Sequence, residues 1–122
     1  MDISIVNSLI KFQTIVKYHH WATPSYDTHK ITDNMFADLA LFTDNFIEAY
    51  MGSSRSQVPR GQKVLCEFNV PTSNESFLKN CEVFCDFLKN LKSRKDMTPQ
   101  LVNMIDEILA TLDKYHFLLR LK

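Results

Sequence analysis

Apolar side chains recur every three or four positions in four separate stretches of the chain. That spacing places them on one face of an α-helix, whereas an alternating pattern would indicate β-strands. The pattern predicts four amphipathic helices, over about residues 3–20, 26–51, 73–92 and 98–120. In the second of these, the predicted core stripe consists of Ile31, Met35, Leu39, Phe42, Phe46 and Tyr50.

Residues that favour helix ends border these stretches. The segment Thr23-Pro24-Ser25 ends the first helix, because proline disfavours helical geometry in the residue before it. Ser25 or Asp27 supplies the N-cap of the second helix, and Gly52 is expected to end it. The segment Thr72-Ser73-Asn74-Glu75 predicts a capping box at the start of the third helix.

The connection lengths predict how the helices pack. Short joints link the first helix to the second and the third to the fourth, so each pair is expected to form an antiparallel hairpin. The connector over residues 52–71 has about twenty residues, enough to return along the whole bundle. Two hairpins joined by one long crossover make a ferritin-like four-helix bundle, a single all-α domain over residues 1–122. The alternative is that the connector is a flexible loop and that the second hairpin does not pack with the first in one bundle. Four apolar residues of the connector favour a packed crossover: Val64, Leu65, Phe68 and Val70.

Charge and composition exclude several classes of protein. The 14 basic and 14 acidic side chains balance, whereas nucleic-acid binders usually carry a basic excess. Arg55, Arg60 and Lys63 in the connector are interpreted as a solvated loop rather than a nucleic-acid site. With only two glycines, the chain is not expected to contain a Gly-rich phosphate-binding loop.

The lengths of the apolar runs and the spacing of the cysteines indicate where in or outside the cell the protein is expected. Charges interrupt every apolar run, so we expect no membrane-spanning helix, and no signal peptide is visible at the N-terminus. Cys66, Cys81 and Cys85 form no CxxC pair, which argues against a disulfide framework or a zinc site. Cys81 and Cys85 lie in an apolar stripe and are expected in the core. We expect an intracellular, cytoplasmic protein, or a virion-associated one if a virus encodes it, rather than a secreted one.

Four polar side chains share the face of the second helix nearly opposite its core stripe. At 100° per residue from His29, the positions of Asp33, Asp44 and Glu48 fall at about 40°, 60° and 100°. Imidazole and carboxylate groups are apt ligands for a divalent first-row metal such as iron. An acidic outer face is also what a solvated helix surface presents, so both interpretations remain open.

If this face binds metal, the remaining ligands are expected from another subunit. Ala37, Ala40 and Ile47 lie on the same face, and the alanines would let a second helix approach closely. A di-iron centre within one chain is not indicated, because its signature is a Glu-x-x-His pair on each of two helices. No glutamate of this chain has a histidine three residues later. Of the other histidines, His19 is expected at the surface and His116 in the core or an interface.

A family resemblance rests on these residues. His20-Trp21 ends the first predicted helix, and His29-xxx-Asp33, ten residues, and Asp44-xxx-Glu48 follow in the second. This arrangement resembles the Dps family of ferritin-like proteins, which protects DNA during starvation and carries the same two patterns. The segment Leu112-Asp113-Lys114, followed by aromatic and aliphatic residues, is similar to the last helix of that family.

The resemblance implies an iron-oxidising site across a two-fold interface between subunits. Carried over by position, its ligands are His20, His29 and Asp33 of one chain with Asp44 and Glu48 of its neighbour. Trp21 would lie near the site, and Ala37, Ala40 and Ile47 in the interface. Family members form homo-oligomeric shells, typically dodecameric. They oxidise Fe(II) with peroxide or oxygen and store ferric mineral, so the resemblance implies a ferroxidase with a di-iron or mono-iron site between subunits.

A second class of function stays open. A bundle could retain a Dps-like scaffold without metal chemistry, as a non-catalytic structural protein or a virion-associated assembly protein. The chain shows no lysine-rich N-terminal tail, so the resemblance carries no expectation of DNA binding here.

Overall fold

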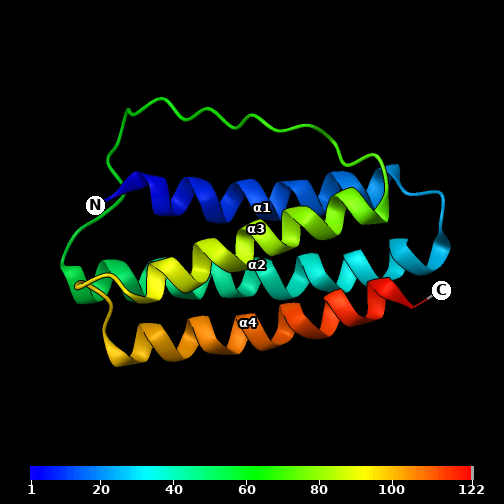
Figure 1. Cartoon of the computed structure of the whole chain (residues 1–122). Helices are drawn as coiled ribbons and strands as arrows, with labels where there is room; N and C mark the ends of the chain where they lie inside the picture. Colours follow the sequence, from blue (N-terminus) through cyan, green and yellow to red (C-terminus); the bar gives the residue numbers. More distant parts are fainter. Residues whose placement is uncertain (122) are drawn as a thin grey trace.

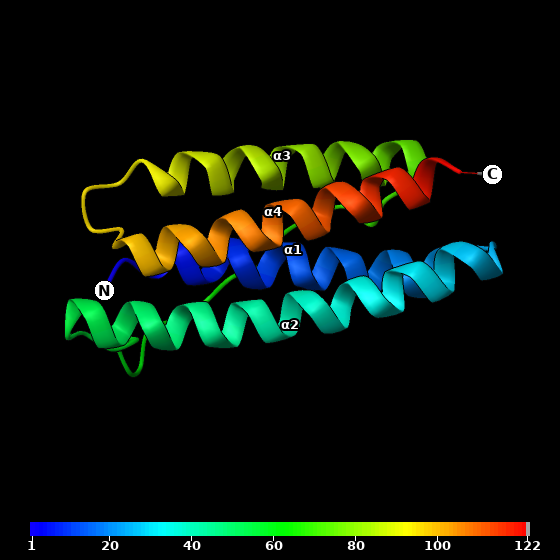
Figure 2. The same ribbon diagram turned by 90° about the horizontal axis from the view of Figure 1, so that it is seen from below.

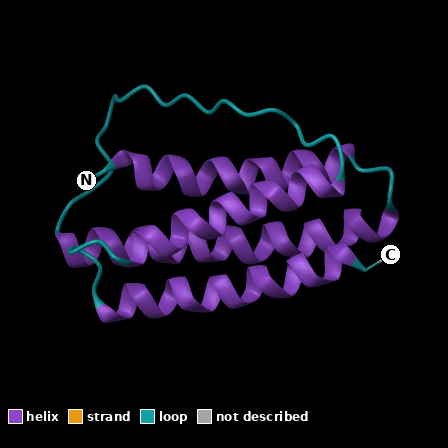
Figure 3. Cartoon of the chain, in the orientation of Figure 1, coloured by secondary structure: helices purple, strands orange, loops and turns teal. Residues whose placement is uncertain are grey.

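The computed structural model describes residues 1–121 and contains four α-helices, with no β-strand in that range. Figures 1 and 3 show α1 (Ile3–Ala22), α2 (Tyr26–Ser54), α3 (Asn74–Lys92) and α4 (Pro99–Arg120). The predicted all-α class is confirmed. Across residues 1–121, no helix combines the length and the apolar character needed to cross a membrane.

The helices lie side by side as two antiparallel pairs. In Figure 1, α1 and α2 run in opposite directions, as do α3 and α4, and Figure 2 shows the same pairs after a 90° turn. Each helix contacts two neighbours: α1 packs on α2 and α3, and α4 packs on the same two helices. The segment 55–73 between α2 and α3 passes along the outside of α1, so α3 starts near the end of the bundle where α2 starts.

The apolar stripes of the four helices meet in one core. Phe46 of α2 and Phe77 of α3 are fully buried, and Phe12 of α1 stacks on Phe84 with ring centroids 4.2 Å apart. Burying such a side chain stabilises a fold by roughly 1.5–3 kcal/mol, so these rings hold the bundle together. The predicted stripe of α2 is buried except for Ile31, which is half-buried.

The predicted end of α2 at Gly52 is wrong. The helix continues to Ser54, and the left-handed residue at its C-terminus is Arg55, with φ 53°. A glycine inside a helix costs only about 1 kcal/mol relative to alanine, so Gly52 alone does not stop one. The hydroxyl of Ser54 donates to the carbonyl of Tyr50 at 2.7 Å and so helps to satisfy the last turn.

Two other helix ends also differ from the prediction. α1 continues to Ala22 rather than ending near residue 20. The capping box of α3 pairs Ser73 with Ser76, not Thr72 with Glu75. The Ser76 hydroxyl oxygen is close enough to accept from the Ser73 N–H at 3.1 Å, and the shorter side chain therefore takes the position that a glutamate usually fills.

The crossover is less buried than the sequence predicts. Phe68 is half-buried against Tyr18, with ring centroids 5.3 Å apart. The other three apolar residues are 55%, 70% and 41% exposed, so the prediction that they pack is wrong for Val64, Leu65 and Val70. The four helical stripes already fill the core, which leaves the crossover on the outside of α1.

Candidate metal site on α2

The imidazoles of His20 and His29 form a stacked pair where α1 ends and α2 begins. Their ring centroids are 3.8 Å apart, and their planes differ by 18°. His20 Nδ1 donates to the backbone carbonyl of His29 at 2.7 Å, and His29 Nδ1 donates back to the carbonyl of His20 at 2.9 Å. These reciprocal bonds hold both rings across the short turn between the two helices.

The bonds also determine the tautomer of each ring. A carbonyl oxygen only accepts, so each Nδ1 carries a hydrogen. In the neutral imidazole the lone pair is then on Nε2, and neither Nε2 bonds to any group of residues 1–121. A ring that donates its Nδ1–H to a carbonyl and presents its Nε2 lone pair has the arrangement usual for a metal-binding histidine.

Thr32 holds the ring of His20 in place through its hydroxyl, a role that the sequence analysis did not predict. Its side chain is fully buried, and its hydroxyl donates to the Thr28 carbonyl at 2.7 Å. The same oxygen is therefore left to accept from His20 Nδ1 at 3.2 Å. A threonine on the core side of a helix often bonds back to the carbonyl four residues earlier, and this spacing of Thr28 and Thr32 is the signal that could have found it.

The three carboxylates of the predicted set lie exposed on the outer face of α2. Asp33 follows His29 by one helical turn, and Asp44 and Glu48 lie one turn apart further along. A hydrogen bond with Asp44, and then its like charge, raise the pKa of Glu48. A cation bound between these two carboxylates would relieve that repulsion.

One chain does not bring the two groups of predicted ligands together. Asp33 and Asp44 are separated by about 16 Å along the helix axis, at 1.5 Å per residue. Across residues 1–121, no three histidine, cysteine, aspartate or glutamate side chains come close enough to hold a metal ion. The structure thus joins His20 to His29, and Asp44 to Glu48, as two separate pairs of candidate ligands, each termed a half-site.

The other residues predicted near the site differ in their exposure. Trp21 is 64% exposed beside His20, and its ring meets that of Tyr18 edge-on at 5.6 Å. Ala37 and Ala40 lie between the half-sites, and of these Ala37 is exposed and Ala40 is half-buried. Ile47, within the half-site of Asp44 and Glu48, is also half-buried. The middle of this face therefore carries small and apolar side chains.

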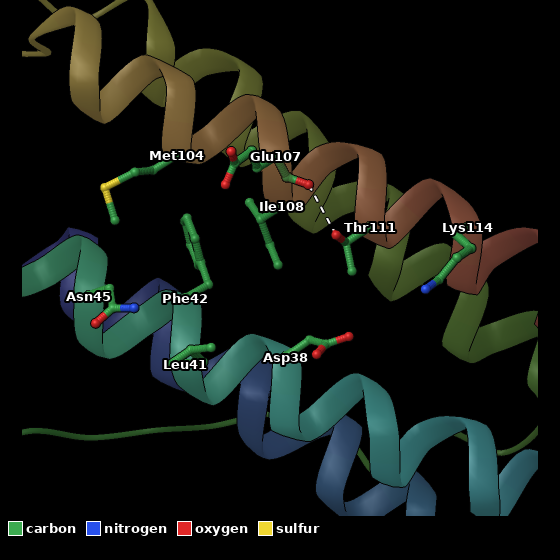
Figure 4. Close-up of a pocket in the computed structure, with 9 residues that line it drawn as sticks. All are labelled: Asp38, Leu41, Phe42, Asn45, Met104, Glu107, Ile108, Thr111 and Lys114. Carbon is green, nitrogen blue, oxygen red and sulfur yellow. Dashed lines mark hydrogen bonds between the residues drawn. The ribbon is translucent and has the colours of Figure 1, made fainter.

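A groove between α2 and α4 lies apart from the half-sites (Figure 4). It encloses about 290 Å³ over Phe42 and Ile108, with Asp38, Glu107 and Lys114 among its lining residues. The hydroxyl of Tyr115 donates to Asp38 at 2.5 Å. Asp38 is therefore engaged in joining α4 to α2.

The remaining histidines hold helices together. The prediction that His19 lies at the surface is wrong: it is 3% exposed, and its ring stacks on Phe77 with centroids 4.3 Å apart. The reason is that α3 starts beside the end of α1, where the Asn74 side chain bonds His19 Nε2 at 2.9 Å. His116 is half-buried and bonds Glu82 of α3 at 3.2 Å.

The cysteines take no part in the half-sites. Cys81 is buried as predicted, and burial raises the pKa of its thiol. Cys85 is half-buried, and burial raises the pKa of its thiol to about 11. Cys66 is exposed in the crossover.

Comparison with known families gives a match over most of the chain. A family model covers residues 20–119, most of the chain, and describes a family of unknown function, DUF5856. The chain belongs to the DUF5856 family. The DUF5856 match starts at His20 and spans every predicted ligand through Glu48. No curated protein and no solved structure matches the chain.

Proposed function

We propose that two copies of this chain form a Dps-like iron-binding and iron-oxidising site across a two-fold interface, in a ferritin-like homo-oligomer. The observation that carries the proposal is the reciprocal bonding of His20 and His29, which leaves both Nε2 lone pairs available. Two antiparallel hairpins, joined by one crossover that lets α2 and α3 run in the same direction, support the ferritin-like arrangement.

The candidate ligands are symmetrically placed along α2. The midpoint between Asp38 and Leu39 is equally far from His29 and Glu48, and equally far from Asp33 and Asp44. In an antiparallel contact of two α2 helices centred there, His29 of one copy lies opposite Glu48 of the second copy. A two-fold contact repeats this arrangement, so it generates two equivalent sites.

The side chains at the centre of this contact are small or apolar, as a close contact between two helices requires. Ala37 and Ala40 are also symmetrical about the same midpoint, as are Phe36 and Leu41. The alanines permit close approach of the helix axes. Leu41 is 64% exposed in the single chain, so contact with a second copy would remove its apolar surface from water.

The ligand set fits iron as a substrate. Imidazole and carboxylate donors suit Fe(II), and the carboxylates favour the Fe(III) that remains after an electron passes to peroxide or oxygen. Asp44 and Glu48 supply two carboxylates, whereas His20 and His29 supply two nitrogen donors and Asp33 a third carboxylate. Each half alone lacks the other's ligands, which makes oxidation dependent on the dimer.

The first experiment removes one half-site. The D44N/E48Q variant keeps side-chain size and removes both charges, and we expect Fe(II) oxidation by peroxide, followed as ferric absorbance, to slow at least about tenfold. The control variant D86N/E107Q removes two exposed carboxylates of α3 and α4 and should oxidise iron at the unmodified rate. An unchanged rate for D44N/E48Q, with intact helical circular dichroism, contradicts the proposal.

The second experiment tests whether the site is shared. H29N/D33N and D44N/E48Q are each expected to be inactive alone. After subunit exchange, each mixed dimer has one site with all five ligands and one that keeps only His20. Half of the dimers are mixed, so about a quarter of all sites should become active. Recovery on mixing supports the interface, whereas a site within one chain would recover nothing.

Absence of ferric product from the unmodified, assembled protein would favour the second function class. The chain would then be a non-catalytic bundle, such as a structural or virion-associated assembly protein. Assembly size, measured by light scattering beside the oxidation assay, separates this outcome from failure to oligomerise.

A further inference from the structure

The crossover between α2 and α3 contains a run of backbone without hydrogen bonds. Between Lys63 and Val70, no backbone N–H or carbonyl group bonds to another group of residues 1–121. Figure 1 shows this segment passing along the outside of α1, away from the other helices. A free backbone edge of this kind is a template for pairing with another strand.

The side chains of the segment are those of a strand rather than of a solvated loop. Val64 and Leu65 are 55% and 70% exposed, and Val70 is 41% exposed. β-branched and other apolar residues favour strands, and strand edges left open in natural proteins are usually short, charged or covered. Here apolar side chains and free backbone groups are exposed together.

The charges of the segment are complementary to themselves. Lys63 and Glu67 lie at equal distances on either side of Leu65. Neither makes an ion pair within the described part of the chain. In an antiparallel pair with Leu65 opposite itself, Lys63 of each copy faces Glu67 of the other.

We propose that residues 63–67 of two copies of this chain pair as an antiparallel two-stranded ribbon centred on Leu65. The second copy is the partner because its segment carries the matching charges in the required register. Val64 of each strand then lies opposite Cys66 of the other. The ribbon satisfies backbone groups of both crossovers and shields their apolar side chains.

This contact is separate from the outer face of α2, because the crossover covers α1. It therefore does not depend on the iron site, and a chain with both faces assembles beyond a dimer. Two strands alone are marginally stable, so pairing depends on concentration and strengthens where another interface already holds the copies together.

Site-specific crosslinking tests the register. In the C66S/L65C variant the two introduced thiols lie opposite each other, near enough for a disulfide once diamide is added as oxidant. In the control variant C66S/K63C each thiol faces Glu67 of the second copy instead. We expect disulfide dimers from the first variant and few from the second, and equal yields from both would overturn the register.

Charge exchange tests the pairing without altering the core. K63E and E67K, each made in the C66S/L65C background, place like charges opposite each other and should lose the crosslinked dimer. Mixing the two restores opposite charges at both ends, so mixed dimers are expected, and the K63E/E67K double variant should crosslink by itself. Single variants that crosslink like their parent would overturn the proposal. Fe(II) oxidation by the same variants is a separate readout, so this proposal and the iron site can fail independently.

Discussion

The hydroxyl of Tyr115 on α4 donates a 2.5 Å hydrogen bond to the carboxylate of Asp38 on α2. Burial, followed by this bond, raises the pKa of Tyr115, whose side chain is 5% exposed. The bond joins the second helix of one hairpin to the second helix of the other. It therefore connects elements that the chain brings together only through the long crossover.

Tyr115→Phe should destabilise the bundle by about 1–2 kcal/mol, because it removes a hydrogen bond to a charged group and leaves the ring in place. Urea unfolding followed by circular dichroism measures the difference. Tyr18→Phe is the matched control, since Tyr18 is 43% exposed, and should change stability by less than about 0.5 kcal/mol. Equal losses in the two variants would show that the bond to Asp38 contributes nothing.

A second network ties the N-terminus to the turn between α3 and α4. Arg94 bonds Asp2 at 2.8 Å and Asp96 at 3.1 Å, and the Tyr50 hydroxyl also donates to Asp96. Hydrogen bonds from Ser4 and Arg94 lower the pKa of Asp2 from 3.8 to about 2, and the bond from Arg94 lowers that of Asp96. Each carboxylate is thus favoured in its charged form by the folded state.

The network should make stability decrease in acid. Because the folded pKa values lie below the unfolded ones, the contribution is complete above about pH 4 and is lost as the pH falls toward about 2. Arg94→Met should lower stability at neutral pH by at most about 1 kcal/mol, since the pairs are partly exposed, and should weaken the acid dependence. Lys95→Met on the same turn should leave the dependence unchanged. Urea midpoints across this range measure both effects, and an unaltered acid slope in Arg94→Met would contradict the assignment.

His19 should add a second pH dependence in a milder range. Burial lowers its pKa below the ordinary 6.5, and its Nδ1 is buried without a partner in the described chain. The unfolded chain therefore binds this proton more tightly, so stability is complete above about pH 6.5 and decreases below it. His19→Phe keeps the stacking on Phe77 and should flatten the curve between about pH 7 and 5. His116→Asn should retain the slope, and the same slope in both variants would exclude His19 as its source.

Thr32→Val tests the support of the histidine pair. It keeps the branched shape and removes the hydroxyl that contacts His20, and lost support of this kind usually weakens metal affinity by about 10–100-fold. Trp21, the one tryptophan of the sequence, lies beside His20, so quenching of its fluorescence by Co(II) reports binding. Thr43→Val, another buried change on α2, should bind Co(II) with unmodified affinity. Equal affinities in the two variants would show that Thr32 gives no support.

The apolar stripe of α2 shows which features of a helix can be predicted from the spacing of its apolar residues. Apolar spacing correctly predicted that Met35 and Phe46 are buried, and that Asp44 and Glu48 are exposed on the opposite face. These outcomes follow from the rotation of 100° per residue, which is a local property of a helix. The end of the helix did not follow, because Gly52 is tolerated inside it and the last turn is satisfied by serine hydroxyls.

Amino-acid order alone determined the all-α class, the four helices and the outward position of the acidic stripe. Only the tertiary structure decided that His19 is buried, that Leu65 is exposed, and that His20 and His29 bond each other's carbonyls. The physical reason is the range of the interactions. Helical periodicity depends on neighbours three or four residues away, whereas these three outcomes depend on where α3, the crossover and the α1–α2 turn come to lie.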